Sequence, residues 1–284
     1  MEAGKEVTPN IRLVRVLDKG SMGSVWVADH LTLGTQVAVK FMSPEVASKP
    51  NLVARFTREA HAAAQIKSVH VVQIFDHGIT PEGTPYIAME LLEGESLQKR
   101  LKRDGPMSAA TTSVVIGQTC KALTKAHALG IVHRDIKPAN IFLMDSEGDI
   151  FIKLLDFGVA KQGDGDLSMT RTNEKVGTPF YMCPEQLISA KHVDFRADIW
   201  STGIVAYHCL VGQVPFKANT FGDLCLAVSR GVFTPPSRVR PELPATLDAW
   251  FLKALARDPA KRFESARHAA DELDRASRGE PPRV

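Results

Sequence analysis

The pattern of apolar residues changes near residue 93, and this change limits the folds that the chain can adopt. Earlier segments rich in Val, Ile and Leu lie between Gly-containing turns, which is typical of strands; they are residues 11–17, 24–28, 35–41, 72–76 and 85–90. Later segments repeat apolar residues with helical spacing; they are residues 109–128, 195–210, 247–256 and 265–276. The pattern predicts a small strand-rich lobe and a larger helical lobe, with a hinge and cleft near residues 90–95.

One predicted helix, residues 51–67, interrupts the strands. Its apolar residues recur every three or four positions, and Glu59 falls on the same stripe. A carboxylate on an apolar stripe needs a partner, because burying an unpaired charge is costly. In the predicted strand 35–41, Lys40 shares a face with the small residue Ala38. We expect this face to line a cleft and Lys40 to be the partner of Glu59.

Composition narrows the class of protein. The chain has 284 residues and a net charge of +3, with no run of Lys and Arg that would favour nucleic-acid binding. It has no apolar stretch of the roughly 18 residues that a membrane span needs. Residues 1–10 lack the apolar core of a secretory signal, so we expect a cytoplasmic protein or, alternatively, the cytoplasmic part of a longer membrane protein. The four cysteines have no metal-site spacing and are expected to be reduced thiols.

A glycine-containing turn, residues 18–25, joins the first two predicted strands. Gly20 and Gly23 would let backbone N–H groups approach phosphate oxygens, because glycine has no Cβ in the way. A plain hairpin turn is the alternative interpretation of this motif by itself.

The strongest chemical motif lies in residues 131–143. Asp135 is followed by the cation Lys137, by a proline and by the carboxamide Asn140, an arrangement that an ordinary turn does not require. A second acid, Asp156, follows an apolar segment and precedes Phe157. Asn140 and Asp156 carry hard oxygen ligands, the kind that Mg²⁺ prefers when it also binds substrate phosphates.

Together these motifs resemble the eukaryotic-type (Hanks-type) serine/threonine protein kinases, particularly the bacterial ones. The resemblance runs in order from about residue 11 to residue 275. It rests on Lys40 and Glu59 and on further motifs at residues 133–140, 156–158, 177–185, 198–203 and 258–263. It implies an α+β fold of two lobes: a small antiparallel β-sheet lobe with one helix, and a larger, mainly helical lobe. The expected boundaries are residues 11–90, a hinge at 91–95, residues 96–275, and a tail or linker start at 276–284.

The resemblance also implies the activity. The chain would transfer the γ-phosphoryl group of ATP, with Mg²⁺ (or Mn²⁺ in its place), to Ser and Thr hydroxyls of proteins. Asp135 would accept the proton of the substrate hydroxyl, with Lys137 near the γ-phosphate. Lys40, positioned by Glu59, would bind the α- and β-phosphates, and Asn140 and Asp156 would bind the metal.

Further residues acquire roles through the same resemblance. The expected ATP-binding residues, besides Lys40 and Asp156, are Leu17, Gly20, Gly23, Val25, Ala38, Met89, Glu90, Leu92 and Leu143. Thr178, Glu185 and Arg262 belong to the segment that seats the substrate peptide, and Glu185 is expected to pair with Arg262. Lys137 and Thr178 favour serine/threonine over tyrosine kinases.

Regulation by phosphorylation is a further implication. Arg134 and Lys161 would receive a phosphate on the segment between Gly158 and Gly177. We predict autophosphorylation at Thr170 and Thr172, with a second copy of the chain as a transient partner.

Three positions depart from the family pattern. Asp18 replaces a glycine at the mouth of the expected phosphate site, Cys183 replaces an alanine, and Ala139 gives no preference for basic substrates. Cys183 would be a packed thiol or, alternatively, a redox switch. Loss of the glycine leaves a pseudokinase, a nucleotide- or partner-binding signalling module, as the alternative function. A small-molecule phosphotransferase is a third interpretation, although such enzymes lack the segment at residues 177–185.

Overall fold

A computed structural model describes residues 1–20, 23–144, 148–157, 179–188 and 193–283. The chain divides into two compact units. Unit 1 comprises residues 1–67 and 71–93, and unit 2 comprises residues 68–70 and 94–284. His70 belongs to unit 2 because its carbonyl accepts the Leu154 N–H at 2.9 Å and its Nδ1 lies 3.1 Å from the Ile152 carbonyl oxygen.

Unit 1 is built on an antiparallel sheet that has six strands among the described residues, in the order β1-β2-β3-β4-β6-β5. The strands are β1 (Glu6–Thr8), β2 (Ile11–Gly20), β3 (Gly23–His30), β4 (Thr35–Met42), β5 (Ile74–Ile79) and β6 (Pro85–Glu90). Alternating residues of β4 face a buried cluster that includes Val37, Val39 and Phe41. The opposite face of β4 therefore carries Ala38 and Lys40, as the alternation predicts.

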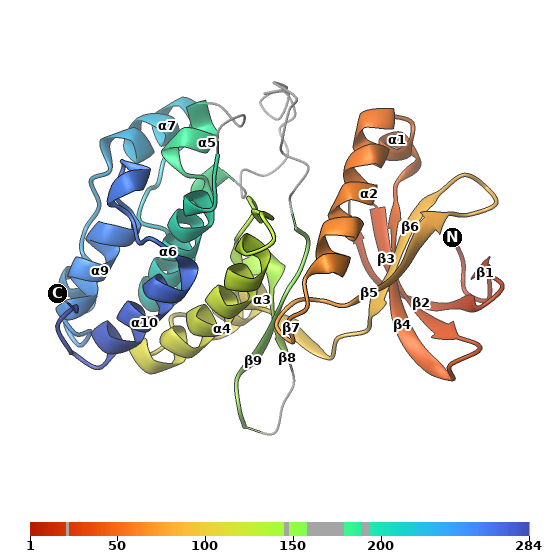
Figure 1. The fold of residues 1–284 in the computed structure, drawn as a ribbon, viewed down its shortest axis with the longest axis horizontal. Coiled ribbons are helices and arrows are strands. Elements are labelled where there is room, and N and C mark those ends of the chain that lie inside the picture. The colour runs from red at the N-terminus through yellow and green to blue at the C-terminus, as the bar shows by residue number, and fades with distance from the viewer. Residues whose placement is uncertain (21–22, 145–147, 158–178, 189–192, 284) are drawn as a thin grey trace. The chain divides into compact units, whose positions relative to one another are not determined.

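Two helices accompany this sheet. In α1 (Pro44–Ala47), the Ser43 side chain accepts the Val46 N–H and caps the first turn. The longer α2 (Pro50–Gln65) buries Phe56, Ala60, Ala62 and Ala63, and it packs against β5 and β6 (Figure 1). The sequence predicted a single helix here, and α1 is an additional short one.

Unit 2 is mainly helical. Its helices are α3 (Leu97–Asp104), α4 (Ala109–His127), α5 (Pro184–Ile188), α6 (Arg196–Val211), α7 (Phe221–Arg230), α8 (Pro236–Val239), α9 (Thr246–Ala254) and α10 (Ala266–Ser277). A small antiparallel sheet of β7 (Gly94–Ser96), β8 (Ile141–Met144) and β9 (Phe151–Leu154) accompanies them. In the part of the chain that is described, no helix is long and apolar enough to cross a membrane.

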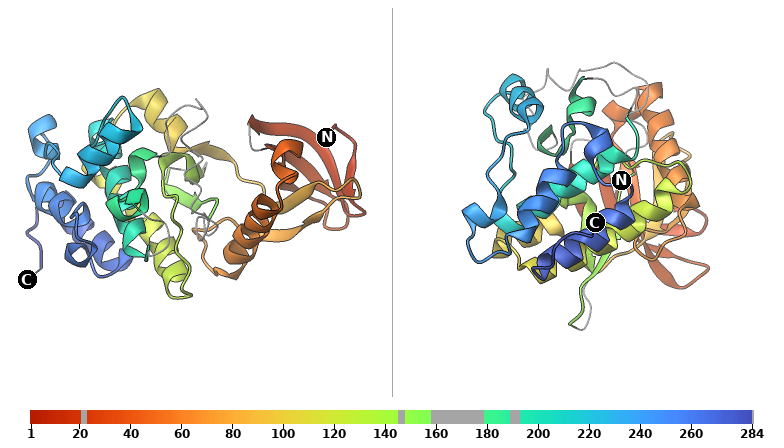
Figure 2. Two further views of the ribbon diagram at one scale, coloured as in Figure 1. Left: turned by 90° about the horizontal axis from the view of Figure 1, so that it is seen from above. Right: turned by 60° about the vertical axis from the view of Figure 1, so that its left-hand side comes forward.

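The centre of unit 2 is α6, which packs against α4, α9 and α10 (Figures 1 and 2). Nearly every residue of α6 is buried, including the polar Asp198, Ser201 and Thr202. A Cβ on Gly203 would meet the Leu255 side chain at 2.9 Å, so glycine permits this close packing. A helix that is buried all round is a rigid support for the loops that contact it.

The long helices and strands of the sequence analysis are present, and their ends differ by a few residues. The structure adds further elements, and all of them except α3 and α7 have five residues or fewer: β1, β7, β8, β9, α1, α3, α5, α7 and α8. Residues near the end of the described chain contact α10. The Arg283 N–H donates to Glu272 at 3.1 Å, and Arg275 donates to the Pro281 carbonyl at 3.0 Å.

Candidate active site

A buried carboxylate on α6 holds the loop that contains Asp135. Asp198 is completely buried. It accepts the backbone N–H groups of His133 at 2.8 Å and Arg134 at 2.7 Å, and His127 Nε2 lies 2.8 Å from it. Hydrogen bonds to a carboxylate are stronger than those between neutral groups, so they fix the backbone of this loop. The loop is bent where they act, because Arg134 has a φ of +64°.

His133 links the same loop to the end of β9. Its Nδ1 accepts the Asp135 N–H at 3.2 Å, so its Nε2 carries the proton that is donated to the Leu155 carbonyl at 2.9 Å. Burial lowers the pKa of His133 despite the opposing charge of Asp198. The neutral ring therefore places Asp135 and the segment before Asp156 together.

Asp135 lies at the centre of a small polar group. Lys137 Nζ donates to its Oδ2 at 2.8 Å, and Asn140 Nδ2 donates to the same oxygen at 3.1 Å and to the Asp135 carbonyl at 2.9 Å. The Asp135 side chain is 17% exposed, so it is held in place but can still be reached. The spacing of these residues in the sequence thus brings a carboxylate, a cation and a carboxamide into contact.

Asn140 and Asp156 are connected through the backbone. The Leu155 N–H donates to the Asn140 carbonyl at 2.8 Å, and Asp156 is the next residue. Asp156 is exposed and has a φ of +46°, whereas the neighbouring Phe157 is completely buried. The Asn140 amide nitrogen donates to Asp135, so Asn140 would bind the metal through its amide oxygen, Oδ1. An amide oxygen and a carboxylate fit Mg²⁺, which takes few protein ligands when phosphates supply the rest.

An ion pair between Glu185 and the buried Arg262 holds the segment that is expected to seat a peptide. Arg262 Nη1 and Nη2 donate to Glu185 Oε1 and Oε2 at 2.6 and 2.9 Å. The Arg262 side chain is completely buried and also packs over the Trp200 ring. Burial acts to raise the pKa of Glu185, but the hydrogen bonds and charge of Arg262 outweigh it and hold that pKa below its usual range. The pair therefore fixes α5 to the loop before α10.

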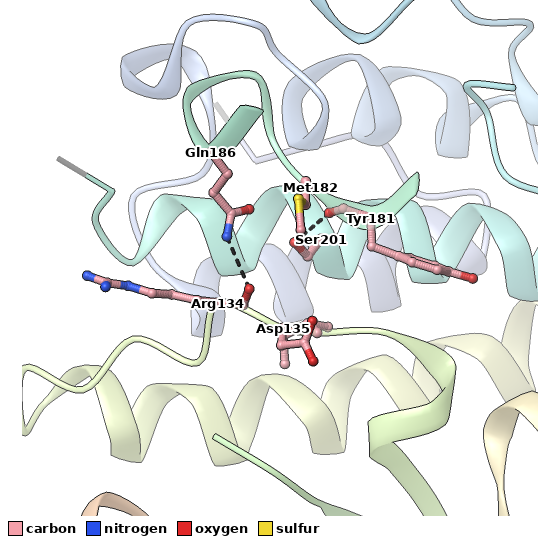
Figure 3. Close-up of a pocket in the computed structure, with 7 residues that line it drawn as sticks. Arg134, Asp135, Tyr181, Met182, Gln186 and Ser201 are labelled. Carbon is pink, nitrogen blue, oxygen red and sulfur yellow. Dashed lines mark hydrogen bonds between the residues drawn. The ribbon is translucent and has the colours of Figure 1, made fainter. Parts of the chain in front are cut away.

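Figure 3 shows where this segment meets the loop that contains Asp135. Gln186 Nε2 donates to the Arg134 carbonyl at 3.1 Å, and Ser201 Oγ donates to the Tyr181 carbonyl at 2.7 Å. These residues line one small pocket with Asp135, Ile136 and Met182. Sequence reasoning did not single out Gln186, Ser201 or His127, because their roles depend on contacts between segments far apart in the chain.

Arg134 is the one arginine of the described residues that leaves two buried nitrogen atoms, Nε and Nη1, without a hydrogen-bond partner. Its Nη2 donates to the Val193 carbonyl at 3.1 Å. Burial lowers the pKa of Arg134, against the attraction of Asp198. The residues predicted to act with it, Lys161, Thr170 and Thr172, lie outside the described residues, as does Thr178.

In unit 1, Lys40 lies on β4 between Val25 of β3 and Ile87 of β6. Ala38 is buried two residues before it, and Glu59 is partly buried on α2. All of these residues belong to the same compact unit. The strand register thus places Val25 beside Lys40 and Met89 beside Ala38.

The glycine hairpin joins β2 to β3. Gly23 has a φ of +150°, and a Cβ there would meet the Phe41 carbonyl oxygen at 1.8 Å, so this position requires glycine. A Cβ on its pairing partner Gly20 would meet nothing within 4 Å. Asp18 is exposed, and its Oδ1 accepts the Lys19 N–H at 2.9 Å. Its side chain therefore lies in solvent. Leu17 is 42% exposed.

Three other expected nucleotide contacts are partly buried: Met89, Leu92 and Leu143. The Glu90 N–H donates to the Gln73 carbonyl at 2.9 Å, and the Glu90 carboxylate accepts the Gln73 N–H at 2.6 Å. These bonds hold the end of β6, directly before the expected hinge at residues 91–95.

Cys183 is a packed thiol. Its side chain is completely buried, and Sγ donates to Gln186 Oε1 at 3.2 Å. Burial strongly raises the pKa of this thiol, so the reactive thiolate is suppressed. The redox-switch interpretation therefore has no support in the geometry around Cys183.

A comparison with protein-family models decides the family. The model described as the protein kinase domain matches residues 11–272. The chain belongs to the protein kinase family. The two-lobed α+β fold predicted from the sequence is confirmed by this match and by kinase structures of the same fold.

Individual relatives are bacterial. Over 90% of this chain, the sequence is 41% identical to the serine/threonine-protein kinase Pkn1 of Myxococcus xanthus. Over 99% of this chain, it is 36% identical to the serine/threonine-protein kinase PknB of Mycobacterium tuberculosis. It covers 36% and 45% of these two relatives, so it spans less than half of their length. The crystal structure of the M. tuberculosis PknI kinase domain matches 98% of this chain with a TM-score of 0.77 at 28% identity, and all of that domain is covered.

Proposed function

We propose that this chain is a protein serine/threonine kinase that transfers the γ-phosphoryl group of ATP to Ser and Thr hydroxyls. The observation that carries the proposal is the Asp135 carboxylate, held by Lys137 and Asn140 on a loop that Asp198 anchors. The names of the Pkn1 and PknB relatives support the same activity and acceptor class. Lys40, Glu59, Asp135, Asn140 and Asp156 are all present, which weighs against the pseudokinase alternative.

Asp135 and Lys137 would act directly on the reacting groups. The carboxylate of Asp135 orients the substrate hydroxyl and accepts its proton, and its bonds to Lys137 and Asn140 fix its orientation. The Lys137 ammonium offers positive charge to the transferring phosphoryl group. Phosphoryl transfer through a loose transition state depends mainly on such positioning and charge stabilisation.

Asn140 and Asp156 would hold Mg²⁺, or Mn²⁺ in its place. A metal ion held there would neutralise charge on the phosphates. The Leu155–Asn140 backbone bond keeps the two backbone segments that carry these residues together. The buried Phe157 anchors the segment that follows β9 and contains Asp156.

Lys40 would bind the α- and β-phosphates, and Glu59 would position it. Val25, Ala38 and Leu143 would contact adenine with Leu17 and Met89, and the backbone of Glu90 and Leu92 would hydrogen-bond to it. The backbone of Gly20 and Gly23 would approach the phosphates. Glu185, Arg262 and Thr178 would seat the acceptor peptide, for which the buried Glu185–Arg262 pair is the structural support.

We also propose activation by autophosphorylation at Thr170 and Thr172, with a second copy of the chain as a transient partner. The two unpartnered nitrogen atoms of Arg134 are suited to a phosphate group. Residues 11–275 would form the catalytic domain, in the cytoplasm. The free cysteines of the described residues are consistent with that reducing compartment.

The test is a transfer assay on purified protein with Mg²⁺ and labelled ATP. Three peptides that differ only in a Ser, Thr or Tyr acceptor should separate the acceptor classes, with label expected on Ser and Thr. Mass spectrometry of active protein should find phosphate on Thr170 and Thr172. Label on Tyr alone, or no label on any acceptor or on the chain itself, contradicts the proposal.

A further inference from the structure

A tyrosine in the peptide segment is bonded to a histidine on α6. Tyr181 ends the short 3-10 turn Pro179–Tyr181, and its hydroxyl oxygen lies 2.9 Å from His208 Nδ1. The two rings are also stacked, with centroids 6.4 Å apart. Figure 3 shows the Tyr181 ring extending away from Arg134 and Gln186, while its backbone stays beside Ser201.

Both ends of Tyr181 are therefore attached to the buried helix. Ser201 Oγ holds its carbonyl, and His208, two helical turns further along α6, holds its hydroxyl. The next residue, Met182, donates its N–H to the Pro179 carbonyl at 3.1 Å. Tyr181, Met182 and Ser201 line the pocket beside Asp135, so the position of this turn sets one wall of that pocket.

The bond joins two neutral groups. Burial lowers the pKa of His208, and the nearby Lys217 lowers it further. Burial also strongly raises the pKa of Tyr181. Both side chains stay uncharged near neutral pH, where a buried hydroxyl or imidazole needs a partner because an unsatisfied polar group is costly.

We propose that His208 is a positioning residue for the acceptor peptide, acting through Tyr181. It holds the turn at residues 179–181 against α6, beside Asp135, and so fixes the segment along which the acceptor peptide would lie. This inference rests on the proposed kinase function, and it adds a residue that touches neither ATP nor the reacting atoms.

Kinetics with the best acceptor peptide test the proposal. Tyr181→Phe and His208→Phe should each raise the KM for the peptide about three- to tenfold, the worth of one buried hydrogen bond. The KM for ATP should stay unchanged. Because the two residues act through one bond, the double variant should lose no more than either single variant. His208→Gln, which can bond to the tyrosine hydroxyl, should recover part of the loss.

Tyr207→Phe is the matched control. Tyr207 precedes His208 on α6, and its hydroxyl donates to the Thr234 carbonyl at 2.8 Å. Removal of this hydroxyl therefore breaks a similar hydrogen bond outside the peptide segment. The control should leave the KM for the peptide unchanged. An equal rise in Tyr207→Phe, or no rise in the other two variants, overturns the proposal.

Hydrogen exchange provides a readout that needs no activity. Amide exchange at residues 179–188 should become faster in Tyr181→Phe and His208→Phe but not in Tyr207→Phe. Unchanged exchange in all three variants would refute the positioning role. A parent protein that transfers no phosphate would instead refute the proposed function, and the exchange result would still decide the role of His208.

Discussion

The catalytic loop and the glycine hairpin are held in different ways. Residues 133–140 are fixed by side chains, above all by the buried Asp198, which accepts two backbone N–H groups. Residues 18–20 and 23–25 of the hairpin are held mainly by strand pairing, and the backbone at Gly23 permits no side chain. Within the described part of the hairpin, the Asp18 side chain has one hydrogen bond, which it accepts from the N–H of its neighbour Lys19.

The difference shows where each region tolerates change. A loop that carries catalytic groups needs atoms fixed within fractions of an ångström, and buried charged hydrogen bonds supply that rigidity. A hairpin that covers phosphates through its backbone needs close approach and little side-chain chemistry. We therefore expect substitutions to have large effects around Asp198 and small effects at Asp18.

The largest effect on stability is expected at Asp198. Asp198→Ala leaves the buried N–H groups of His133 and Arg134 unsatisfied, which should lower the free energy of unfolding by about 4 kcal/mol. The displaced loop should lower kcat by about 100-fold or more. Urea unfolding and a transfer assay measure both effects.

The control for this variant is Asp194→Ala. Asp194 pairs with Arg196 at 2.6 Å, but its side chain is 44% exposed. A screened surface pair contributes about 1 kcal/mol or less, so the control should differ little from the parent. Equal losses in both variants would show that Asp198 has no special anchoring role.

The next largest loss of stability is expected for Arg262→Ala. It leaves the partly buried Glu185 carboxylate without its partner, at an expected cost of about 3 kcal/mol. Arg262→Lys keeps the charge but loses the fork of two hydrogen bonds, so it should recover only part of this. Thermal unfolding compares them, and a lysine variant as stable as the parent would contradict the bidentate role.

The same pair should show in the pH dependence of stability. Because the pKa of Glu185 lies below its ordinary value in the folded chain, the pair contributes stability above the ordinary glutamate pKa and loses it as the pH falls below that value. The parent should therefore lose its advantage over Arg262→Ala on acidification through about pH 4.5. Urea unfolding at several pH values between 3 and 6 measures this, and a constant difference would contradict it.

A pair of glycine variants tests the hairpin. Gly23→Ala places a Cβ against the Phe41 carbonyl and should cost about 2 kcal/mol, because the backbone must move. Gly20→Ala meets nothing within 4 Å and should cost well under 1 kcal/mol. Melting temperatures separate them, and similar losses would contradict the account of the turn.

The smallest effect is expected at Asp18. Asp18→Asn keeps the shape of the side chain and removes its charge, which solvent screens. The KM for ATP should change less than about twofold, because a screened charge contributes well under 1 kcal/mol. A tenfold gain in ATP affinity would show that Asp18 faces the phosphates instead of solvent.

Much of the fold could be predicted because periodic apolar residues survive in the long elements. Residues 85–90 form β6 as predicted, and residues 109–128 form α4 with one residue fewer. Polar segments gave no such signal: α3 (Leu97–Asp104) contains five charged residues and is buried only at Leu97 and Leu101. Short strands such as β7 depend on partners far away in the sequence.

The candidate site could likewise be predicted only in part from the sequence. Asp135, Lys137 and Asn140 lie within one local motif, so the sequence alone indicated that they meet. The supports of that motif could not be found locally, because His127, Gln186 and Ser201 act on residues 20 to 71 positions away. Such contacts are decided by how α4, α5 and α6 pack.

The central claim is that Asp135 is the catalytic base of phosphoryl transfer. The direct measurement is a single-turnover transfer of labelled phosphate by the parent, by Asp135→Asn and by Asp149→Asn, an exposed acid that serves as the control. Asp135→Asn should be slower by about 10²- to 10⁴-fold, while Asp149→Asn matches the parent. A rate for Asp135→Asn equal to that of the parent would contradict the account.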